Sequence, residues 1–321
     1  MKAIELTPEH PPDRVASLAA RAEGVGFETV FASCHYFNRD PFQTLTRVAA
    51  ETDFVTLGPG VLNPYESHPV TLASQAATLD EISDGRAVFG VGAGDRSTLS
   101  ALGFEHDRPL ARVHETVQVV RALWAGERVD HDGVITVRDA ELNLEARELP
   151  VFVGAQGPQM LRMAAAIADG VLVNAAHPDD LAWASDQLDE GDERRERPGS
   201  ATRLAFASVS VAPDGDAARE AARPPVAFIV GGTAAPVLER HGIDPEAATV
   251  VSNALEAGDL HRAFERVTPA MIDAFCVAGD PEAVTDRLAA IQEHVDGVVV
   301  GSPLGPDLEQ AVELASEALD D

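Results

Sequence analysis

Polar or glycine-rich residues follow most of the short apolar runs in this sequence. In a parallel α/β barrel, the carboxyl ends of the strands and the loops behind them form the active site, so these residues are the first candidates for chemistry. They are Glu5, Ser33-Cys34-His35, Gly60-Val61-Leu62-Asn63, Gly92-Ala93-Gly94-Asp95, Gly154-Ala155-Gln156-Gly157, Asn174 and Gly301-Ser302. This glycine-rich and polar set suits a large planar ligand that the backbone approaches closely.

Three glycine-rich motifs offer different chemistry. The motif GVGAGD (90–95) has the spacing GxGxG instead of GxGxxG, and no suitable acidic residue follows about 20 positions on, so a dinucleotide-binding fold is disfavoured. The motif VGAQGPQM (153–160) passes from a strand into a helix that begins at a proline, and VGSPLGP (300–306) repeats this arrangement. Exposed amides at such a helix start bind anions, and ordinary turn formation is the alternative for both motifs.

The elements that position these residues are short apolar strands alternating with helical patterns, which is typical of a parallel α/β fold. Eight strands are predicted, at 2–6, 27–33, 54–61, 86–92, 150–155, 170–174, 203–211 and 296–302. Helices are predicted at 11–24, 41–52, 69–83, 109–125, 158–168, 179–189, 215–240, 281–294 and 306–319. Gly24 and Gly170 are interpreted as helix C-caps. Eight βα units favour a closed (β/α)8 TIM barrel, in one domain spanning 1–321.

Two segments interrupt this alternation. Residues 126–149 read as a β-hairpin around Asp132-Gly133, inserted after the helix that follows the fourth strand. Residues 224–275 form a second insertion, which is mostly helical and rich in Pro, Gly and His. We therefore expect a barrel with two insertions and no second independent domain.

Composition excludes several classes of protein. The 321 residues include 53 acidic and 24 basic side chains, a formal net charge of -29, and Lys2 is the single lysine. Such a charge repels nucleic-acid backbones and anionic membrane surfaces, so neither partner is expected. No apolar run is long enough to span a bilayer, and no signal peptide is recognised, which predicts a cytoplasmic protein. The excess of carboxylates is interpreted as adaptation to molar salt, although a simple surface excess is the alternative.

The stretch from Cys34 to Asp95, which contains GPGVLNPY and TLDEISDGRA, resembles the luciferase-like monooxygenase superfamily. More closely it resembles the deazaflavin-dependent methylenetetrahydromethanopterin reductases, and 150–175, 225–243 and 298–306 match the same reductases. The resemblance covers essentially the whole chain. It implies a bacterial luciferase-like TIM barrel that binds coenzyme F420 and transfers a hydride to N5,N10-methylene-tetrahydropterin, giving the N5-methyl form. It also implies a homodimer or homotetramer.

The resemblance also implies roles for individual residues. Glu5 matches a candidate proton donor to the pterin, and pairing with Arg39 is the structural alternative. The matched cofactor-binding residues are His35, Gly60, Val61, Asp95, Gly154, Ala155, Gln156 and Asn174. The bond Gly60-Val61 matches a non-prolyl cis peptide at the end of the third strand. Capping of the next helix is the alternative for Asp95.

One position departs from the family pattern, because Cys34 stands where an aspartate is usual. The two cysteines, Cys34 and Cys276, have no metal-ligand spacing, and no metal is predicted. Cys34 leaves open a methylenetetrahydrofolate reductase that uses NAD(P)H or FMN. Another F420-dependent dehydrogenase of the superfamily and a non-catalytic flavoprotein are the remaining alternatives. The choice between tetrahydromethanopterin and tetrahydrofolate stays open.

Overall fold

The computed structural model describes residues 1–35 and 37–320, and its residue contacts divide the chain into two compact units. The first unit holds Met1, 3–174 and 183–204, and the second holds Lys2, 175–182 and the chain from Ala205 onward. Every candidate residue from Glu5 to Asn174 lies in the first unit. The single domain expected from the sequence stays a prediction.

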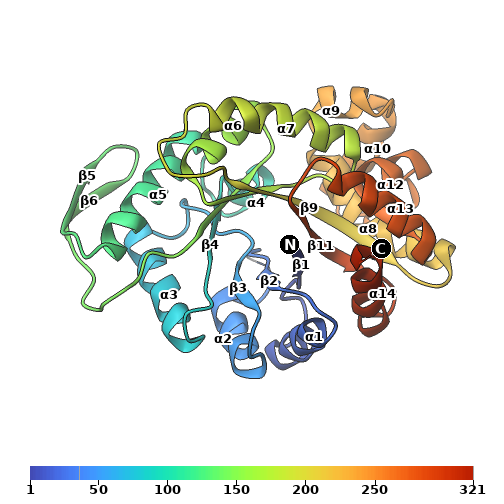
Figure 1. The fold of residues 1–321 in the computed structure, drawn as a ribbon. Helices are drawn as coiled ribbons and strands as arrows, with labels where there is room; N and C mark the ends of the chain where they lie inside the picture. Colours follow the sequence, from blue (N-terminus) through green and yellow to red (C-terminus); the bar gives the residue numbers. More distant parts are fainter. Residues whose placement is uncertain (36, 321) are drawn as a thin grey trace. The chain divides into compact units, whose positions relative to one another are not determined.

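The first unit contains the βα elements that carry the candidate residues (Figure 1). They are β1 (Lys2–Glu5), α1 (Pro12–Gly24), β2 (Thr29–Ala32), α2 (Pro41–Glu51), β3 (Thr56–Pro59), α3 (Pro69–Ile82), β4 (Phe89–Gly92), α4 (Arg96–Ala101), α5 (Pro109–Trp124), β5 (Val129–Asp132), β6 (Thr136–Ala140), β7 (Val151–Ala155), α6 (Pro158–Ile167) and β8 (Gly170–Val173). The boundary with the second unit falls within α7 (Pro178–Asp192) and near the start of β9 (Thr202–Val211).

Six of the predicted strands lie side by side in the first unit. The pairs β1–β2, β2–β3, β4–β7 and β7–β8 are parallel, and the bridges Leu57↔Ala87 and Leu62↔Val91 connect the β3 and β4 segments. Every residue of β2, β4 and β8 is buried. Strands that bury both faces are typical of parallel sheets covered by helices, and this pattern explains why the sequence shows continuous apolar runs.

Helix starts follow the aspartate–proline pattern in the sequence. Asp40 accepts a hydrogen bond from the backbone N–H of Gln43 at 2.9 Å, directly before Pro41 begins α2. In the second unit, Asp280 accepts one from Ala283 at 2.9 Å before Pro281 begins α13. An N-cap carboxylate satisfies an otherwise unpaired amide, and proline at the first helical position loses no intrahelical bond.

Arginine side chains bind the carbonyl groups at several helix carboxyl ends. At the end of α6, Arg121 donates to the carbonyl of Ile167 at 2.6 Å, and Arg195 donates to those of Ala165 and Ala168 at 2.7 and 2.6 Å. The last carbonyl groups of a helix have no intrahelical donor. The planar, permanently charged guanidinium supplies several donors in fixed directions, which suits such a cluster of carbonyls.

The first predicted insertion is a hairpin, as expected. Strands β5 and β6 pair antiparallel, and Figure 1 shows this hairpin projecting beside α5. Glu115 of α5 holds its turn, because its carboxylate accepts hydrogen bonds from the backbone N–H of Val134 and Ile135 at 3.2 and 2.9 Å. Burial raises the pKa of Glu115, but these backbone donors and His131 bring it below its usual value.

The second unit contains β9, two further strands and most of the carboxyl-terminal helices. They are α8 (Gly215–Gly232), α9 (Ala235–Arg240), α10 (Pro245–Glu256), α11 (Leu260–Glu265), α12 (Pro269–Phe275), β10 (Val277–Gly279), α13 (Pro281–Gln292), β11 (Gly297–Leu304) and α14 (Leu308–Asp320). Strand β9 neighbours both β11 and β10. The helical insertion has its own core, which includes Val226, Val251 and Met271.

Four local differences separate the structure from the sequence expectations. Gly24 is the last residue of α1, and Val25 is its C-cap. The short helix α4 lies within a predicted loop, and the predicted helix 215–240 is divided into α8 and α9. Gly170 is the first residue of β8 and does not cap α6, which ends at Ile167. A Cβ at Gly170 would lie 2.2 Å from the ring of Phe152, so the glycine is needed for close packing between neighbouring strands.

Candidate active site at the carboxyl ends of the strands

Glu5 is a buried carboxylate at the carboxyl end of β1, with an exposed fraction of 2%. Its Oε1 atom accepts a hydrogen bond from the hydroxyl of Thr7 at 2.7 Å and another from the hydroxyl of Ser33 at 2.6 Å. The pairing of Glu5 with Phe31 in β2 places Ser33, two residues further on, beside the carboxylate. Arg39 donates instead to the backbone carbonyl of Glu9 at 2.6 Å. Glu5 therefore has the burial and fixed orientation that a proton donor requires.

The loop after β2 carries Cys34 and His35. The imidazole of His35 is exposed, and its ring contacts that of Phe37 edge-to-face with centroids 5.1 Å apart. Burial, together with the nearby carboxylates of Glu66 and Asp40, raises the pKa of the Cys34 thiol to about 12. The thiol is therefore protonated at neutral pH, and Cys34 does not supply a thiolate nucleophile.

The third strand ends in the cis peptide bond Gly60-Val61, at the predicted position. The side chain of Val61 fills the space beside two glycines of neighbouring strands. A Cβ at Gly92 would lie 2.6 Å from Val61 Cγ2, and a Cβ at Gly154 would lie 3.1 Å from the same atom. These glycines make room for the bulge after β3, so an aspartate at position 154 would press against Val61.

Asp95 follows β4 and is the N-cap of α4. Its Oδ1 atom accepts hydrogen bonds from the backbone N–H and from the hydroxyl of Thr98, both at 2.8 Å. The residue is exposed at the carboxyl end of the strand. The capping alternative for Asp95 is therefore present in the structure, and its contact with a cofactor stays a prediction.

The ends of β7 and β8 bring Gln156 and Asn174 together. Ala155 pairs with Val173 in the parallel ladder, and Gln156, which directly follows β7, donates from Nε2 to the carbonyl of Asn174 at 3.4 Å. Both side chains are exposed, whereas Ala155 is buried. Helix α6 begins just beyond. Its N-cap residue is Gly157, and in the described part of the chain the N-cap makes no side-chain hydrogen bond to the first amides of the helix. This start of α6 keeps the amide donors that favour an anion.

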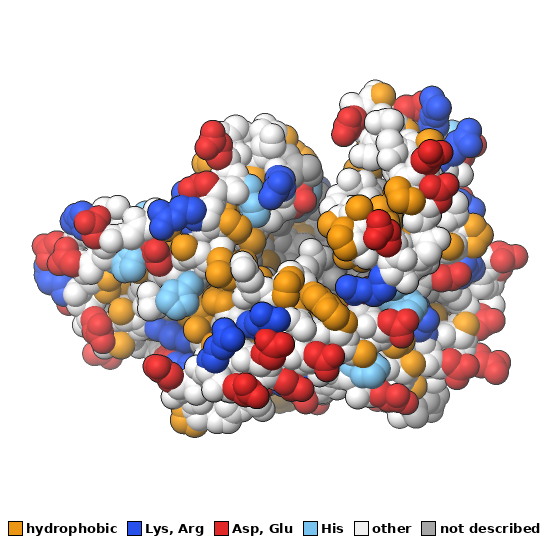
Figure 2. All heavy atoms as spheres, turned by 90° about the horizontal axis from the view of Figure 1, so that it is seen from above, with side chains coloured by type: hydrophobic (Ala, Val, Ile, Leu, Met, Phe, Trp, Pro, Cys, Tyr) orange, Lys and Arg blue, Asp and Glu red, His pale blue; other side chains and the backbone are white. Residues whose placement is uncertain are grey.

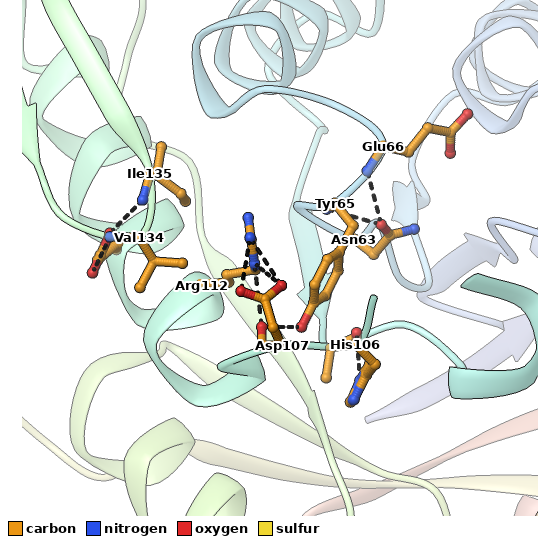
Figure 3. A network of polar contacts seen from close by, with 10 residues as sticks. Asn63, Tyr65, Glu66, His106, Asp107, Arg112, Val134 and Ile135 are labelled. Carbon is orange, nitrogen blue, oxygen red and sulfur yellow. Dashed lines mark hydrogen bonds and ion pairs between the residues drawn. The ribbon is translucent and has the colours of Figure 1, made fainter. Parts of the chain in front are cut away.

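A polar and aromatic network, which the sequence analysis did not find, connects the loop after β3 with the segment before α5 (Figure 3). Tyr65 donates from its hydroxyl to the carbonyl of Asp107 at 2.8 Å, and its ring stacks on that of His106 with centroids 5.5 Å apart. The guanidinium of Arg112 lies 4.7 Å from the Tyr65 ring centroid and also binds the Asp107 carboxylate. Asn63, buried, accepts from the backbone N–H of Tyr65 at 3.1 Å.

This network fixes the loop that follows the Gly60-Val61 bond. Burial raises the pKa of the Tyr65 hydroxyl, the charge of Asp107 also raises it, and Arg112 opposes the change. The hydroxyl therefore stays protonated and acts as a hydrogen-bond donor. The sequence contained one signal, the NPY that ends GPGVLNPY, but nothing in it paired Tyr65 with a segment more than 40 residues away.

Comparison with known proteins places the chain among characterised relatives. The sequence model described as luciferase-like monooxygenase matches residues 2–296. The chain belongs to the luciferase-like monooxygenase family. It is 39% identical to proteins named 5,10-methylenetetrahydromethanopterin reductase from Archaeoglobus fulgidus and Methanolobus tindarius. These matches cover 98% of this chain in both cases, and 97% and 98% of the two relatives.

The structural comparison agrees with the sequence comparison. The coenzyme F420-dependent tetrahydromethanopterin reductase from Methanopyrus kandleri superposes with a TM-score of 0.91 at 38% identity, covering 99% of this chain and 98% of that one. The predicted luciferase-like (β/α)8 fold of this family member is thereby confirmed. Among the described residues, the helices are all too short or too polar to cross a membrane.

Proposed function

We propose that this protein reduces N5,N10-methylene-tetrahydropterin to the N5-methyl form, with reduced coenzyme F420 as the hydride donor. The observation that carries this proposal is the buried Glu5 at the end of β1, held by Thr7 and Ser33. It occurs in a chain that matches named methylenetetrahydromethanopterin reductases over 98% of its length. A deazaflavin supplies a hydride when it is bound, and the proton must come from the protein or from water.

The residues at the strand ends fit such a cofactor. His35, Gln156 and Asn174 are exposed there, and their ring and amide groups supply the donors and acceptors that a pyrimidine-like edge requires. Gly60 and Val61 follow β3, and Gly154 and Ala155 end β7, so we expect their backbone to approach the cofactor. The uncapped start of α6 suits the anionic tail of the cofactor, because helix amino ends favour negative charge.

Glu5 is the proposed general acid. Opening the methylene bridge leaves electrons on N10 of the pterin, which must take up a proton as the carbon receives the hydride. A buried carboxyl group that is protonated supplies this proton without water entering the site. Hydroxyl donors from Thr7 and Ser33 then stabilise the carboxylate that remains.

The finer assignments rest on the relatives. Two relatives at 39% identity are named for tetrahydromethanopterin, which favours this pterin over tetrahydrofolate. The matched Methanopyrus kandleri structure, which is described as coenzyme F420-dependent, favours F420 over NAD(P)H or FMN. Because the family signature residue at position 34 is replaced by cysteine, the test includes all of these donors and both pterins.

The decisive experiment is a turnover assay with the purified protein. We expect methylene-tetrahydromethanopterin to reoxidise reduced F420. The return of the deazaflavin absorbance measures this reaction. NADH and reduced FMN in place of reduced F420, and methylene-tetrahydrofolate in place of the methanopterin substrate, serve as parallel reactions. Turnover with NADH and no binding of F420 would overturn the cofactor assignment. Turnover only with methylene-tetrahydrofolate would change the pterin and keep the reaction.

Adaptation to salt and a homodimeric or homotetrameric assembly are separate proposals. Acidic side chains are spread over the face shown in Figure 2, with arginines among them, in a chain of net charge -29. Self-repulsion of this size destabilises a compact state until salt screens it. We expect the melting temperature to rise from low to molar salt, and light scattering in molar salt to give two or four chains. A melting temperature independent of salt would argue against adaptation.

A further inference from the structure

Three phenylalanine side chains are exposed among the described residues of the first unit, and they lie at different ends of the strands. Phe54 precedes β3, at the amino ends, and is 84% exposed. Phe37 follows β2 and Phe104 follows α4, both beyond the carboxyl ends, and their exposed fractions are 67% and 37%. Single apolar side chains are common on protein surfaces, so exposure alone assigns no role. Phe37 differs from the other two in how its loop is held.

The loop that carries Phe37 is joined to the loop that follows Glu5. At its beginning, the hydroxyl of Ser33 donates to the Glu5 carboxylate at 2.6 Å. At its end, the backbone N–H of Arg39 donates to the carbonyl of Pro8 at 3.2 Å. The chain from Ser33 to Phe37 spans at most about 14 Å between Cα atoms, because each residue advances by no more than about 3.6 Å. Phe37 is therefore held near the proposed general acid.

The ring of Phe37 packs beside a protein ring and keeps most of its surface open. It contacts the imidazole of His35 edge-to-face, with centroids 5.1 Å apart and ring planes at 69°. The backbone N–H of Asn38 donates to the carbonyl of His35 at 2.9 Å, which closes a turn directly after Phe37. This contact and this turn restrict where the ring can lie. About two-thirds of the side chain stays available to a ligand.

The proposed reaction places an aromatic ring of the substrate beside Glu5. This inference rests on the proposed function, in which Glu5 donates a proton to N10 of the pterin substrate. In both tetrahydromethanopterin and tetrahydrofolate, N10 is the nitrogen of an arylamine, so the aryl ring attached to it must bind next to the Glu5 carboxylate. We propose that Phe37 is a substrate-binding residue that packs against this aryl ring. Aromatic pairs of this kind are stabilised in offset-stacked or edge-to-face arrangements.

Phe104 is the alternative partner for the aryl ring, and the order of the strands disfavours it. Strand β1, which carries Glu5, pairs with β2, and β2 pairs with β3. The β3 segment is in turn bridged to the β4 segment. The loop after β2 is therefore the neighbour of Glu5, whereas β2 and β3 lie between Glu5 and the loop that leads from β4 towards Phe104.

The contact has a consequence for specificity. Both tetrahydropterins carry the arylamine, so Phe37 does not distinguish between them. It favours substrates of this class over tetrahydropterins that lack the aryl ring, because only the former can cover the exposed phenylalanine.

Steady-state kinetics with variants of Phe37 test the contact. Phe37→Ala removes a packed ring and the apolar surface that it covers, so we expect the KM for the methylene-tetrahydropterin to rise about ten-fold. We expect kcat to change little, because the aryl ring does not react and is bound equally in the ground state and the transition state. Phe37→Tyr keeps the ring, and its KM should stay within about two-fold of the parent. Equal KM values in Phe37→Ala and Phe37→Tyr would contradict the proposal.

Two controls separate this effect from a general loss of structure. Phe54→Ala removes an exposed ring at the amino ends and should leave KM and kcat at the parental values. The melting temperatures of the Phe37 variants should match that of the parent, because substitutions of exposed side chains have small effects on stability. A rise of KM in Phe104→Ala but not in Phe37→Ala would assign the contact to Phe104 and overturn the proposal.

Inhibition by tetrahydropterins with and without the aryl ring locates the contact on the substrate. The N5-methyl product carries the ring, and 6-methyl-tetrahydropterin lacks it. In Phe37→Ala we expect the inhibition constant of the product to rise about ten-fold and that of 6-methyl-tetrahydropterin to stay at the parental value. Equal rises for the two ligands would place Phe37 at the pterin ring and contradict its assignment to the aryl ring.

Separate results would contradict the Phe37 contact and the proposed function. If the parent protein neither reduces a methylene-tetrahydropterin nor binds either N5-methyl product, the proposed function is wrong, and so is the Phe37 contact that rests on it. If the parent is active and Phe37→Ala keeps the parental KM, the proposed function stands and the contact is wrong. Weaker binding of F420 in Phe37→Ala, with unchanged inhibition by the product, would show that Phe37 acts on the cofactor through His35 and would also overturn the contact.

Discussion

Charged and glycine-rich motifs lie at both the amino ends and the carboxyl ends of the parallel strands in the first unit. The charged side chains at the two ends differ in how many contacts they make with the rest of the protein. At the amino end of the β4 segment, Arg86 donates to the backbone carbonyls of Ala49, Thr52, Val55 and Ser83, at 2.8 to 3.0 Å. Almost all hydrogen-bond donors of this guanidinium are therefore bound to other groups of the protein. It connects the end of α2, the start of β3 and the end of α3.

The neighbouring carboxylates also accept hydrogen bonds from other groups of the protein. Asp80 binds Arg147 through both carboxylate oxygens, at 2.6 and 2.7 Å, and also accepts from the backbone N–H of Ala87. Glu23 accepts from the backbone N–H groups of the segment that leads into β3. Burial raises the pKa of Glu23, but these backbone donors and the charge of Arg86 bring it below its usual value.

At the carboxyl ends, several polar side chains are exposed and make fewer contacts with the protein, although Glu5 is buried. His35, Gln156 and Asn174 are exposed, and one long hydrogen bond of 3.4 Å joins the last two. In barrels of this kind the carboxyl ends carry function and the amino ends carry stability. The motif TLDEISDGRA, which contributes to the family resemblance, therefore holds the fold, whereas Glu5 and the loops after β2, β4 and β7 are the place for chemistry.

The largest expected effect that tests this division is the loss of turnover in Glu5→Gln. Removing a general acid lowers the rate by about 10²–10⁴-fold, because the pterin nitrogen then lacks a positioned proton. The melting temperature should stay close to that of the parent, and Glu9→Gln, at an exposed position on the same loop, serves as the control. Full turnover in Glu5→Gln would show that Glu5, at the carboxyl end of β1, is not needed for the reaction.

Arg86→Leu should show the opposite pattern. Loss of the guanidinium leaves several carbonyl groups without their donor, and we expect the free energy of unfolding to fall by about 3 kcal/mol. Turnover per folded molecule should be preserved. Denaturant unfolding monitored by circular dichroism measures this loss. Arg262→Ala, at an exposed arginine of the second unit, should leave stability unchanged, and a similar loss in both variants would argue against a special role for Arg86.

Asp95 tests whether one residue at the carboxyl ends combines both roles. Asp95→Asn keeps an oxygen to cap α4, so we expect parental stability and an F420 affinity about ten-fold lower, because a charged acceptor is lost. Asp95→Ala should in addition lower the free energy of unfolding by about 1 kcal/mol. Isothermal titration and thermal melting separate the two effects. Unchanged affinity in Asp95→Asn would leave Asp95 as a helix cap alone.

The smallest effect is expected at Cys34. Burial, with Glu66 and Asp40, raises the pKa of its thiol to about 12, so the neutral form that Cys34→Ser preserves is the form present at neutral pH. We expect turnover in this variant to stay within about two-fold of the parent. We also expect alkylation of Cys34 to be far slower than that of a free thiol, as measured by mass spectrometry. A large loss of turnover would assign chemistry to the thiol.

Much of the barrel and of the candidate site was predictable from the sequence, because strand length and the residues after each strand are local properties. Glu5 and Asp95 are found at strand ends where the alternation of strands and helices places them. Which neighbouring side chain packs against a glycine is not a local property of the sequence. Gly154 was expected to contact the cofactor from the family resemblance, which stays a prediction. Its missing Cβ also makes room for Val61, and only the packing of β7 against the bulge after β3 shows this.

Long-range partners were also hidden from the sequence. Thr7 and Ser33 are unremarkable residue types, and their common target appears only when β1 and β2 pair in register. The same is true of Tyr65 with Asp107 and Arg112. The cis bond Gly60-Val61 was expected from the family resemblance alone, since nothing in the residue types at those positions requires it.

The use of arginine at helix ends has a practical consequence for handling the protein. Lysine cannot replace a guanidinium that binds several carbonyls at once, and Lys2 is the single lysine in the chain. Lys2 begins β1, and Glu5 ends the same strand about 10 Å away. Within this sequence, amine-reactive dyes or surfaces therefore have one side-chain target, Lys2 at the amino end of β1, which pairs with Asp320 at 2.9 Å. Such coupling attaches the protein in a defined orientation, with the carboxyl end of β1 directed away from the point of attachment.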